Sequence, residues 1–166
     1  FGTTRYVGRT FIMPNEEARQ RTIRTKLNPI RSEFEGKSVI IMDDSIVRGN
    51  TSRHMVKIAR EMGAKKVYLA SYSPQLLYPC LYGVDMATKR EFIARDRTDE
   101  EIAAEIGADA VVYQTIDQME DAVRTSGNSE LKFCKACFEG TYPTGDITDQ
   151  MISDIEKDRV AAGSCK

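Results

Sequence analysis

The stretch VIIMDDSIVRGNTS, Val39–Ser52, carries four apolar residues directly into two adjacent aspartates and then into a polar turn that contains a glycine. A short apolar run rich in β-branched residues is typical of a strand that is buried on both faces. We therefore predict a strand at Val39–Met42. Thr51 or Ser52 is expected to cap a helix that continues through Met62. The polar turn would then lie between the end of a strand and the start of a helix.

A second strand follows this helix in the sequence. Apolar residues repeat at helical spacing up to Met62, Gly63 ends the pattern, and Val67–Ser71 is the next apolar run. A strand, a helix and a strand within about 33 residues imply a right-handed crossover between parallel strands. The only histidine, His54, is expected on the exposed face of the helix.

The rest of the chain continues the alternation of strands and helices. Thr98 and Glu101 have the spacing of a capping box, and Gly107 follows the last apolar residue of that helix. The later elements are expected at Thr98–Ile106 (helix), Ala110–Tyr113 (strand), Asp117–Arg124 (helix) and Thr148–Val160 (helix). The whole pattern predicts an α/β fold with an open parallel sheet flanked by helices.

Composition limits the class of protein. The chain has 166 residues, of which 41% are hydrophobic and 30% charged, and its formal net charge is -1. Such values are typical of a soluble globular domain, whereas a protein that binds duplex nucleic acid is usually more basic. No apolar run reaches the ~18 residues of a membrane span, and the first residues lack the pattern of a secretory signal. We expect a cytoplasmic protein that binds neither nucleic acid nor a membrane.

The turn after the two aspartates has the features of a phosphate site. Backbone N–H groups at a helix N-terminus bind anions, and Gly49 would let the backbone approach an anion closely. Asp43 and Asp44 would repel a phosphate, so we expect them to face ribose hydroxyls or a magnesium ion. Neither a P-loop nor a dinucleotide-binding fingerprint occurs, and the alternative that the aspartates only cap a turn is open. Further hydroxyl donors come from Ser45, Thr51 and Ser52.

The first part of the chain is locally basic. Between Arg5 and Lys37, lysine and arginine outnumber aspartate and glutamate. Residues 14–30 are compatible with a helix capped by Asn15, but such a helix has few apolar residues to bury. Two interpretations are open: a loop that becomes ordered on a negatively charged ligand, or a solvated basic face.

The four cysteines are too sparse and too unevenly spaced for a small disulfide scaffold. Cys134 and Cys137 have C-x-x-C spacing, which suits a metal ion or a cluster. Cys80 lies in a loop after a strand, and Cys165 lies near the end of the chain. A metal site and a set of ordinary buried thiols are both compatible with this pattern.

Several stretches resemble one family. VIIMDDSIVRGNTS resembles the motif with which type I phosphoribosyltransferases bind phosphoribosyl pyrophosphate (PRPP), and in particular the motif of the amidophosphoribosyltransferases. RYVGRTFIMP, AKKVYLAS, YPCLYGVDM, EFIA and CFEGTYPT resemble other stretches of that family in the same order. The resemblance implies a type I phosphoribosyltransferase fold. Residues 1–166 would be an incomplete phosphoribosyltransferase domain, and residues 144–166 a C-terminal helical extension.

The family reaction that this resemblance implies is phosphoribosyl transfer from PRPP to ammonia derived from glutamine, the first step of purine synthesis. Asp43 and Asp44 would take the ribose hydroxyls and Mg²⁺. Arg24 and Lys26 would contact pyrophosphate as catalytic residues. The 5-phosphate would be held by Ser45, Ile46, Val47, Arg48, Gly49, Asn50 and Thr51. A flexible loop that closes over PRPP would include Arg5, Tyr6 and Arg9.

The resemblance also has implications for partners and cofactors. The glutaminase domain and the first strands of the family lie outside this partial chain, so the chain alone is expected not to use glutamine. Some family members hold a 4Fe–4S cluster, which makes Cys80, Cys134 and Cys137 candidate ligands, with zinc or no metal as alternatives. A homo-oligomer is expected. A regulatory protein that binds PRPP without catalysis is the alternative function.

Overall fold

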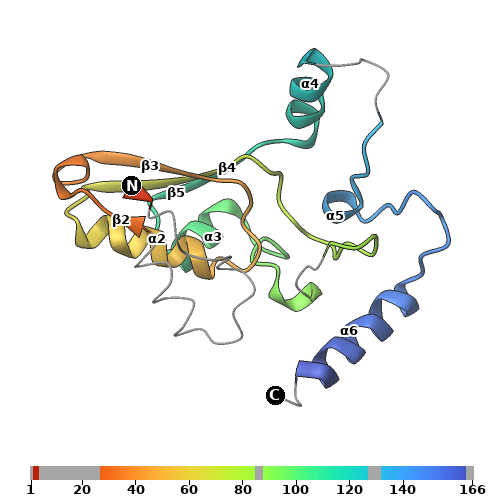
Figure 1. Cartoon of the computed structure of the whole chain (residues 1–166). Coiled ribbons are helices and arrows are strands. Elements are labelled where there is room, and N and C mark those ends of the chain that lie inside the picture. Colours follow the sequence, from red (N-terminus) through yellow and green to blue (C-terminus); the bar gives the residue numbers. More distant parts are fainter. Residues whose placement is uncertain (1, 4–26, 85–87, 127–131, 164–166) are drawn as a thin grey trace.

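The computed structural model describes residues 2–3, 27–84, 88–126 and 132–163 of the chain (Figure 1). Its centre is a parallel sheet of three strands in the order β3-β4-β5. These strands are β3 (Ser38–Asp43), β4 (Lys66–Ser71) and β5 (Ala110–Tyr113). A separate antiparallel pair consists of β1 (Gly2–Thr3) and β2 (Leu27–Asn28). The predicted parallel sheet is confirmed, and each of its three strands lies where the sequence placed one.

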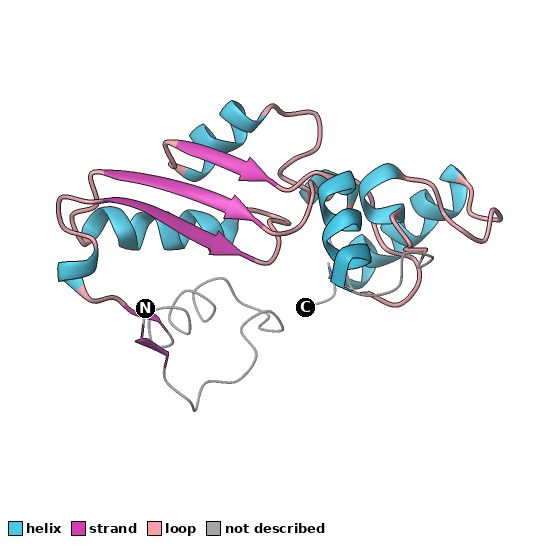
Figure 2. Ribbon diagram, turned by 90° about the horizontal axis from the view of Figure 1, so that it is seen from above, coloured by secondary structure: helices cyan, strands magenta, loops and turns pink. Residues whose placement is uncertain are grey.

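The helices divide into two groups along the chain. The first group is α2 (Asn50–Glu61), which connects β3 to β4, and α3 (Asp99–Ile106), which precedes β5. The second group follows β5 and consists of α4 (Ile116–Ser126), α5 (Ala136–Glu139) and α6 (Asp149–Gly163). In Figure 2 the arrowheads of the sheet strands point to the side where these C-terminal helices lie. Short 3₁₀ turns occur at η2 (Arg31–Glu33) and η3 (Lys89–Glu91).

The main hydrophobic core lies on one face of the sheet. Ile41, Leu69 and Val111 form one row across the three strands, and all three are buried against α2 and α3. Figure 1 shows both helices on the same side of the sheet. On the opposite face Ile40 is 67% exposed and Met42 is 57% exposed. The prediction that β3 is buried on both faces is therefore wrong for the described residues, because both crossover helices pack on the same face.

Two local predictions about α2 are also wrong. The helix is preceded by Gly49 at its N-cap, with φ of 73°, and neither Thr51 nor Ser52 caps it. Ser52 is 2% exposed because it lies on the core side of the helix, one turn before Val56. His54 is 9% exposed, not on the surface as predicted, because it shares a helix face with the buried Ile58 four residues later.

The predicted helices at Thr98–Ile106, Asp117–Arg124 and Thr148–Val160 are confirmed, with boundaries that shift by a few residues. Most of the helix considered for residues 14–30 lies outside the described residues. Thr98 and Glu101 form the predicted capping box of α3, in which the Glu101 amide donates to Thr98 Oγ1 and the Thr98 amide donates to Glu101 Oε2. Gly107 ends this helix with φ of 80°. Among the described residues, no helix combines the length and the apolar character that a membrane crossing requires.

Candidate functional site

The polar loop Asp44–Gly49 connects the carboxyl end of β3 to the N-terminus of α2. Asp43 is the last residue of β3 and lies beside Ser71 on β4, which in turn lies beside Tyr113 on β5. These residues define the edge of the sheet at which α/β proteins bind ligands. The predicted position of the aspartates at the end of a parallel strand is thus confirmed.

The two aspartates differ in their surroundings. Asp43 is half-buried, and its Oδ1 accepts a hydrogen bond of 3.0 Å from the Asp44 amide. Asp44 is exposed, and its Oδ1 accepts from the Ser45 hydroxyl at 3.4 Å. Burial raises the pKa of Asp43 above its ordinary value, and the adjacent Asp44 carboxylate raises this pKa further. A bound cation would relieve both effects, so the pair has the electrostatics of a cation-binding group.

The loop is attached to the molecule at several points. Ile46 is 2% exposed and belongs to the main core. The Val47 carbonyl accepts a 2.9 Å hydrogen bond from the Ile93 amide. The Arg48 guanidinium forms an ion pair with Glu91, with 2.7 Å between Nε and Oε1. These contacts define the path of the loop.

Gly49 has a packing role that the sequence interpretation did not include. A Cβ atom at this position would collide with Ile93 Cδ1 and would lie 3.3 Å from Ile106 Cγ2. Its positive φ is also a conformation that side-chain-bearing residues rarely adopt. The glycine lets the start of α2 approach the core, a function separate from the predicted close approach to an anion.

The side chains predicted to donate hydrogen bonds to the phosphate differ in how buried they are. Ser45 and Thr51 are half-buried at the loop, whereas Ser52 is in the core. The Asn50 side-chain oxygen accepts a 3.0 Å hydrogen bond from Arg53 Nη1. Five predicted residues lie outside the described residues: Arg5, Tyr6, Arg9, Arg24 and Lys26.

The three candidate cysteine ligands lie in one region. Burial raises the pKa of the Cys137 thiol, and Cys80 and Cys134 raise this pKa further, so the three thiols are within electrostatic reach of one another. The amides of Leu77 and Tyr78 each donate to the Cys137 carbonyl at 3.0 Å, which holds the two chain segments together. No group of three potential ligands has the arrangement of a metal site within the described part of the chain. Cys165 lies outside it.

One segment next to the loop was missed by the sequence interpretation. Residues 88–93 include Glu91 and Ile93, the partners of Arg48 and Val47. A signal was available, since Thr88 and Glu91 have the spacing of a capping box, and the structure forms that box at η3. The spacing predicts a helical turn, but it does not predict that the turn lies against the loop.

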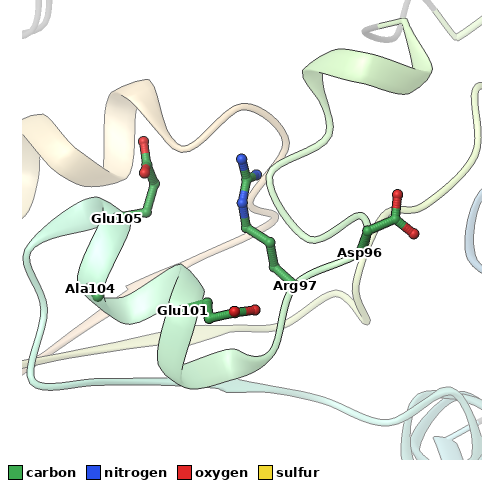
Figure 3. A pocket seen from close by; sticks show the side chains of 5 residues that line it. All are labelled: Asp96, Arg97, Glu101, Ala104 and Glu105. Atoms are coloured by element: carbon green, nitrogen blue, oxygen red, sulfur yellow. The ribbon is translucent and has the colours of Figure 1, made fainter.

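An open pocket lies near the same segment, before and along α3 (Figure 3). It is lined by Asp96, Arg97, Glu101, Ala104 and Glu105. Arg97 Nη1 donates to the Ile93 carbonyl at 3.0 Å, and Glu105 Oε1 accepts from Arg53 Nη2 at 2.7 Å. These charged side chains connect neighbouring elements of the fold, and we assign no ligand to the pocket.

Comparison with known proteins finds similar sequences and similar solved structures. No family model matches the chain. An amidophosphoribosyltransferase of Pasteurella multocida (strain Pm70) is 47% identical over 159 residues, which are 96% of this chain and 32% of that protein. The amidophosphoribosyltransferase of Saccharomyces cerevisiae (strain ATCC 204508 / S288c) is also 47% identical, over 96% of this chain and 31% of its own length.

This chain is homologous to part of the amidophosphoribosyltransferases. The glutamine PRPP amidotransferase from B. subtilis, solved in complex with ADP and GMP, matches with a TM-score of 0.68 and 44% identity over 85% of this chain and 31% of that one. A structure described as the allosteric regulatory enzyme of purine biosynthesis matches with a TM-score of 0.71 and 39% identity, over 92% and 33% of the respective chains. The chain thus spans about a third of these amidophosphoribosyltransferases, and its phosphoribosyltransferase fold is confirmed.

Proposed function

We propose that this chain forms the PRPP-binding part of an amidophosphoribosyltransferase. In the proposed reaction, ammonia derived from glutamine attacks the anomeric carbon of PRPP. Pyrophosphate leaves, and 5-phosphoribosylamine and glutamate are the other products. The observation that carries the proposal is the position of Asp43 and Asp44 at the carboxyl end of a parallel strand, directly before a loop that enters the N-terminus of α2. The names of the homologues favour this transferase over the PRPP-binding regulator.

Each part of the loop has a proposed role. Backbone N–H groups at the start of α2, with the hydroxyls of Ser45 and Thr51, bind the 5-phosphate. Asp43 and Asp44 accept hydrogen bonds from the ribose hydroxyls. Positive charge develops on the sugar in the transition state, and the two carboxylates stabilise that charge electrostatically.

Magnesium is the proposed cation at the aspartates. Mg²⁺ binds oxygen ligands, and it is commonly held by one or two carboxylates together with substrate phosphates. Asp43 and Asp44 supply such carboxylates at the end of β3, and burial and the adjacent Asp44 carboxylate together raise the pKa of Asp43. When bound, the ion would offset charge on the pyrophosphate leaving group.

A 4Fe–4S cluster is the proposed group at Cys80, Cys134 and Cys137, with zinc as the alternative. The chemistry of three thiols suits either one, and the hydrogen bonds from the Leu77 and Tyr78 amides to the Cys137 carbonyl hold the segment before Cys80 beside Cys137. A fourth ligand would come from elsewhere in the protein. Such a group would be structural, because phosphoribosyl transfer involves no electron transfer.

The remaining components of the proposed enzyme extend beyond the described residues. Arg24 and Lys26 would bind pyrophosphate, and Arg5, Tyr6 and Arg9 would belong to a loop that closes over PRPP and excludes water. Residues 1–166 would be part of the phosphoribosyltransferase domain, with residues 144–166 as its helical extension. We expect a glutaminase domain as partner, a homo-oligomeric assembly and a cytoplasmic location.

Calorimetric titration of PRPP into the full chain, with and without Mg²⁺, tests the proposal. We expect binding that depends on Mg²⁺ and is lost in an Asp43→Asn, Asp44→Asn variant. An Asp117→Asn, Asp121→Asn variant is the matched control, because it makes the same change of net charge on the exposed surface of α4. Equal PRPP binding by the two variants would contradict the proposed site.

A further inference from the structure

Residues 88–93, here named the brace, lie along the polar loop and contact three consecutive loop residues. The Ile93 amide donates to the Val47 carbonyl at 2.9 Å. Glu91 Oε1 pairs with Arg48 Nε at 2.7 Å. The Ile93 side chain fills the space beside Gly49, where a Cβ atom would collide with it.

The brace is itself fixed at several points. Phe92 is 1% exposed and forms a small hydrophobic cluster with Leu76. Glu91 Oε2 accepts 2.8 Å and 2.9 Å hydrogen bonds from the amide and the hydroxyl of Thr88. Arg97, seen in Figure 3, donates to the Ile93 carbonyl at 3.0 Å. These attachments fix the brace beside the loop independently of the Arg48–Glu91 ion pair.

We propose that Glu91 is a positioning residue for the PRPP loop: it fixes Arg48, and with it the backbone of Val47–Gly49, in the conformation that receives the phosphate. This inference rests on the proposed function of the loop. Glu91 suits the role because one carboxylate oxygen faces the brace and the other faces the loop.

The electrostatics of Glu91 agree with this arrangement. Partial burial by itself would raise the pKa of Glu91, but the Thr88 amide and the Arg48 guanidinium together hold this pKa below its ordinary value. The side chains of Arg48 and Glu91 are 44% and 41% exposed, so their ion pair adds little to global stability. We therefore expect loss of this ion pair to make the loop more mobile, with little change in the melting temperature.

Hydrogen exchange and PRPP affinity of a Glu91→Gln variant of the full chain test the inference. Glutamine keeps an oxygen that accepts from Thr88 but loses the charge that pairs with Arg48. The direct reporter is the Ile93 amide, because its hydrogen bond joins the brace to the loop. We expect its exchange to be about 2- to 5-fold faster and PRPP binding about 2- to 5-fold weaker, the range that corresponds to one partly exposed ion pair.

The matched control is Glu105→Gln. It removes another ion pair of 2.7 Å, between Arg53 and Glu105, whose side chains are 43% and 48% exposed. That pair connects α2 to α3 and does not include the loop, so the Ile93 exchange rate and the PRPP affinity should stay within 2-fold of wild type.

The possible outcomes separate the inference from the proposed function. Equal Ile93 exchange in the two variants would overturn the positioning role of Glu91, whatever the affinity for PRPP. Faster exchange in Glu91→Gln alone, accompanied by weaker PRPP binding, would support it. Failure of the wild-type chain to bind PRPP would contradict the proposed function, while the exchange measurement, which needs no ligand, would still decide the role of Glu91 in the loop.

Discussion

The polar loop and the cysteine region are built in different ways. The loop is one continuous stretch, Asp44–Gly49, whose two ends are fixed by β3 and α2 and whose middle is fixed by Ile46 and the brace. The cysteine region joins two segments far apart in the sequence, around Cys80 and Cys137, through hydrogen bonds to one carbonyl. Contacts within the chain thus hold the loop in place. The thiols come close to one another, but within the described residues they do not form a metal site.

This difference agrees with the ligands proposed for the two regions. A phosphate cradle uses backbone amides, which the helix start itself orients. A metal or cluster site uses side chains whose negative charges repel, so its full geometry commonly forms only with the ligand. The two regions nevertheless share one hydrophobic cluster, in which Val47 of the loop and Cys137 both pack against Leu76 and Phe92.

The largest expected effect concerns the packing of the loop against the core. Gly49→Ala should destabilise the fold by about 2–4 kcal/mol, because it combines a strained positive φ with overpacking against Ile93. Gly36→Ala is the control, since its φ is 71° and a Cβ atom there would have nothing within 4 Å. Urea unfolding should show a loss of only about 1 kcal/mol for Gly36→Ala. Equal losses would mean that the loop is not held by packing.

In the cysteine region, we expect the free energy of unfolding to change more on metal binding than on substitution of a cysteine. If its thiols bind a metal, a zinc concentration of 100 times Kd should stabilise the chain by about 2.7 kcal/mol. Thermal unfolding with and without zinc measures this effect, and slower alkylation of Cys80 and Cys137 locates it. A Cys134→Ser, Cys137→Ser variant should show neither response. Stabilisation that persists in that variant would place the zinc elsewhere.

The same difference explains how much could be predicted from the sequence. The strand before Asp43, the loop and the capping box of α3 are local patterns, and each was predicted. The contact between Arg48 and Glu91 joins two segments, and no spacing in the sequence encodes it. The predicted exposure of His54 was wrong, because residues four apart share a helix face and His54 lies four residues before the buried Ile58.

The sequence pattern also did not predict which face of the sheet is buried. The apolar run of β3 indicates a strand, but the exposure of Ile40 depends on which side of the sheet receives α2 and α3. For the cysteines, the C-x-x-C spacing predicted that Cys134 and Cys137 are neighbours. The approach of Cys80 depends on backbone hydrogen bonds from Leu77 and Tyr78, which have no signature in the sequence.

The smallest expected effect separates stability from binding at the aspartates. Because the pKa of Asp43 is raised in the folded chain, its ionised form costs folding free energy at neutral pH. Asp43→Asn should therefore increase the free energy of unfolding at pH 7, by about 0.5 kcal/mol, even though it weakens PRPP binding. The wild-type cost decreases as the pH falls through the raised folded pKa and vanishes below the unfolded value. The advantage of the variant should disappear over the same range.

Urea unfolding of both proteins between pH 7 and pH 3 measures this dependence. Among the described residues, the Asp44 carboxylate is the charged group that shifts the pKa of Asp43, so an Asp44→Asn variant is the matched control. It removes the repulsion but leaves the partial burial of Asp43, and it should retain part of the pH dependence. If Asp43→Asn is less stable than wild type at pH 7, the ionised carboxylate stabilises the fold. In that case its position before the loop does not lower the folding stability. A gain in stability with a loss of PRPP affinity would identify Asp43 as a residue placed for its ligand, in contrast to Gly49, which is placed for the fold.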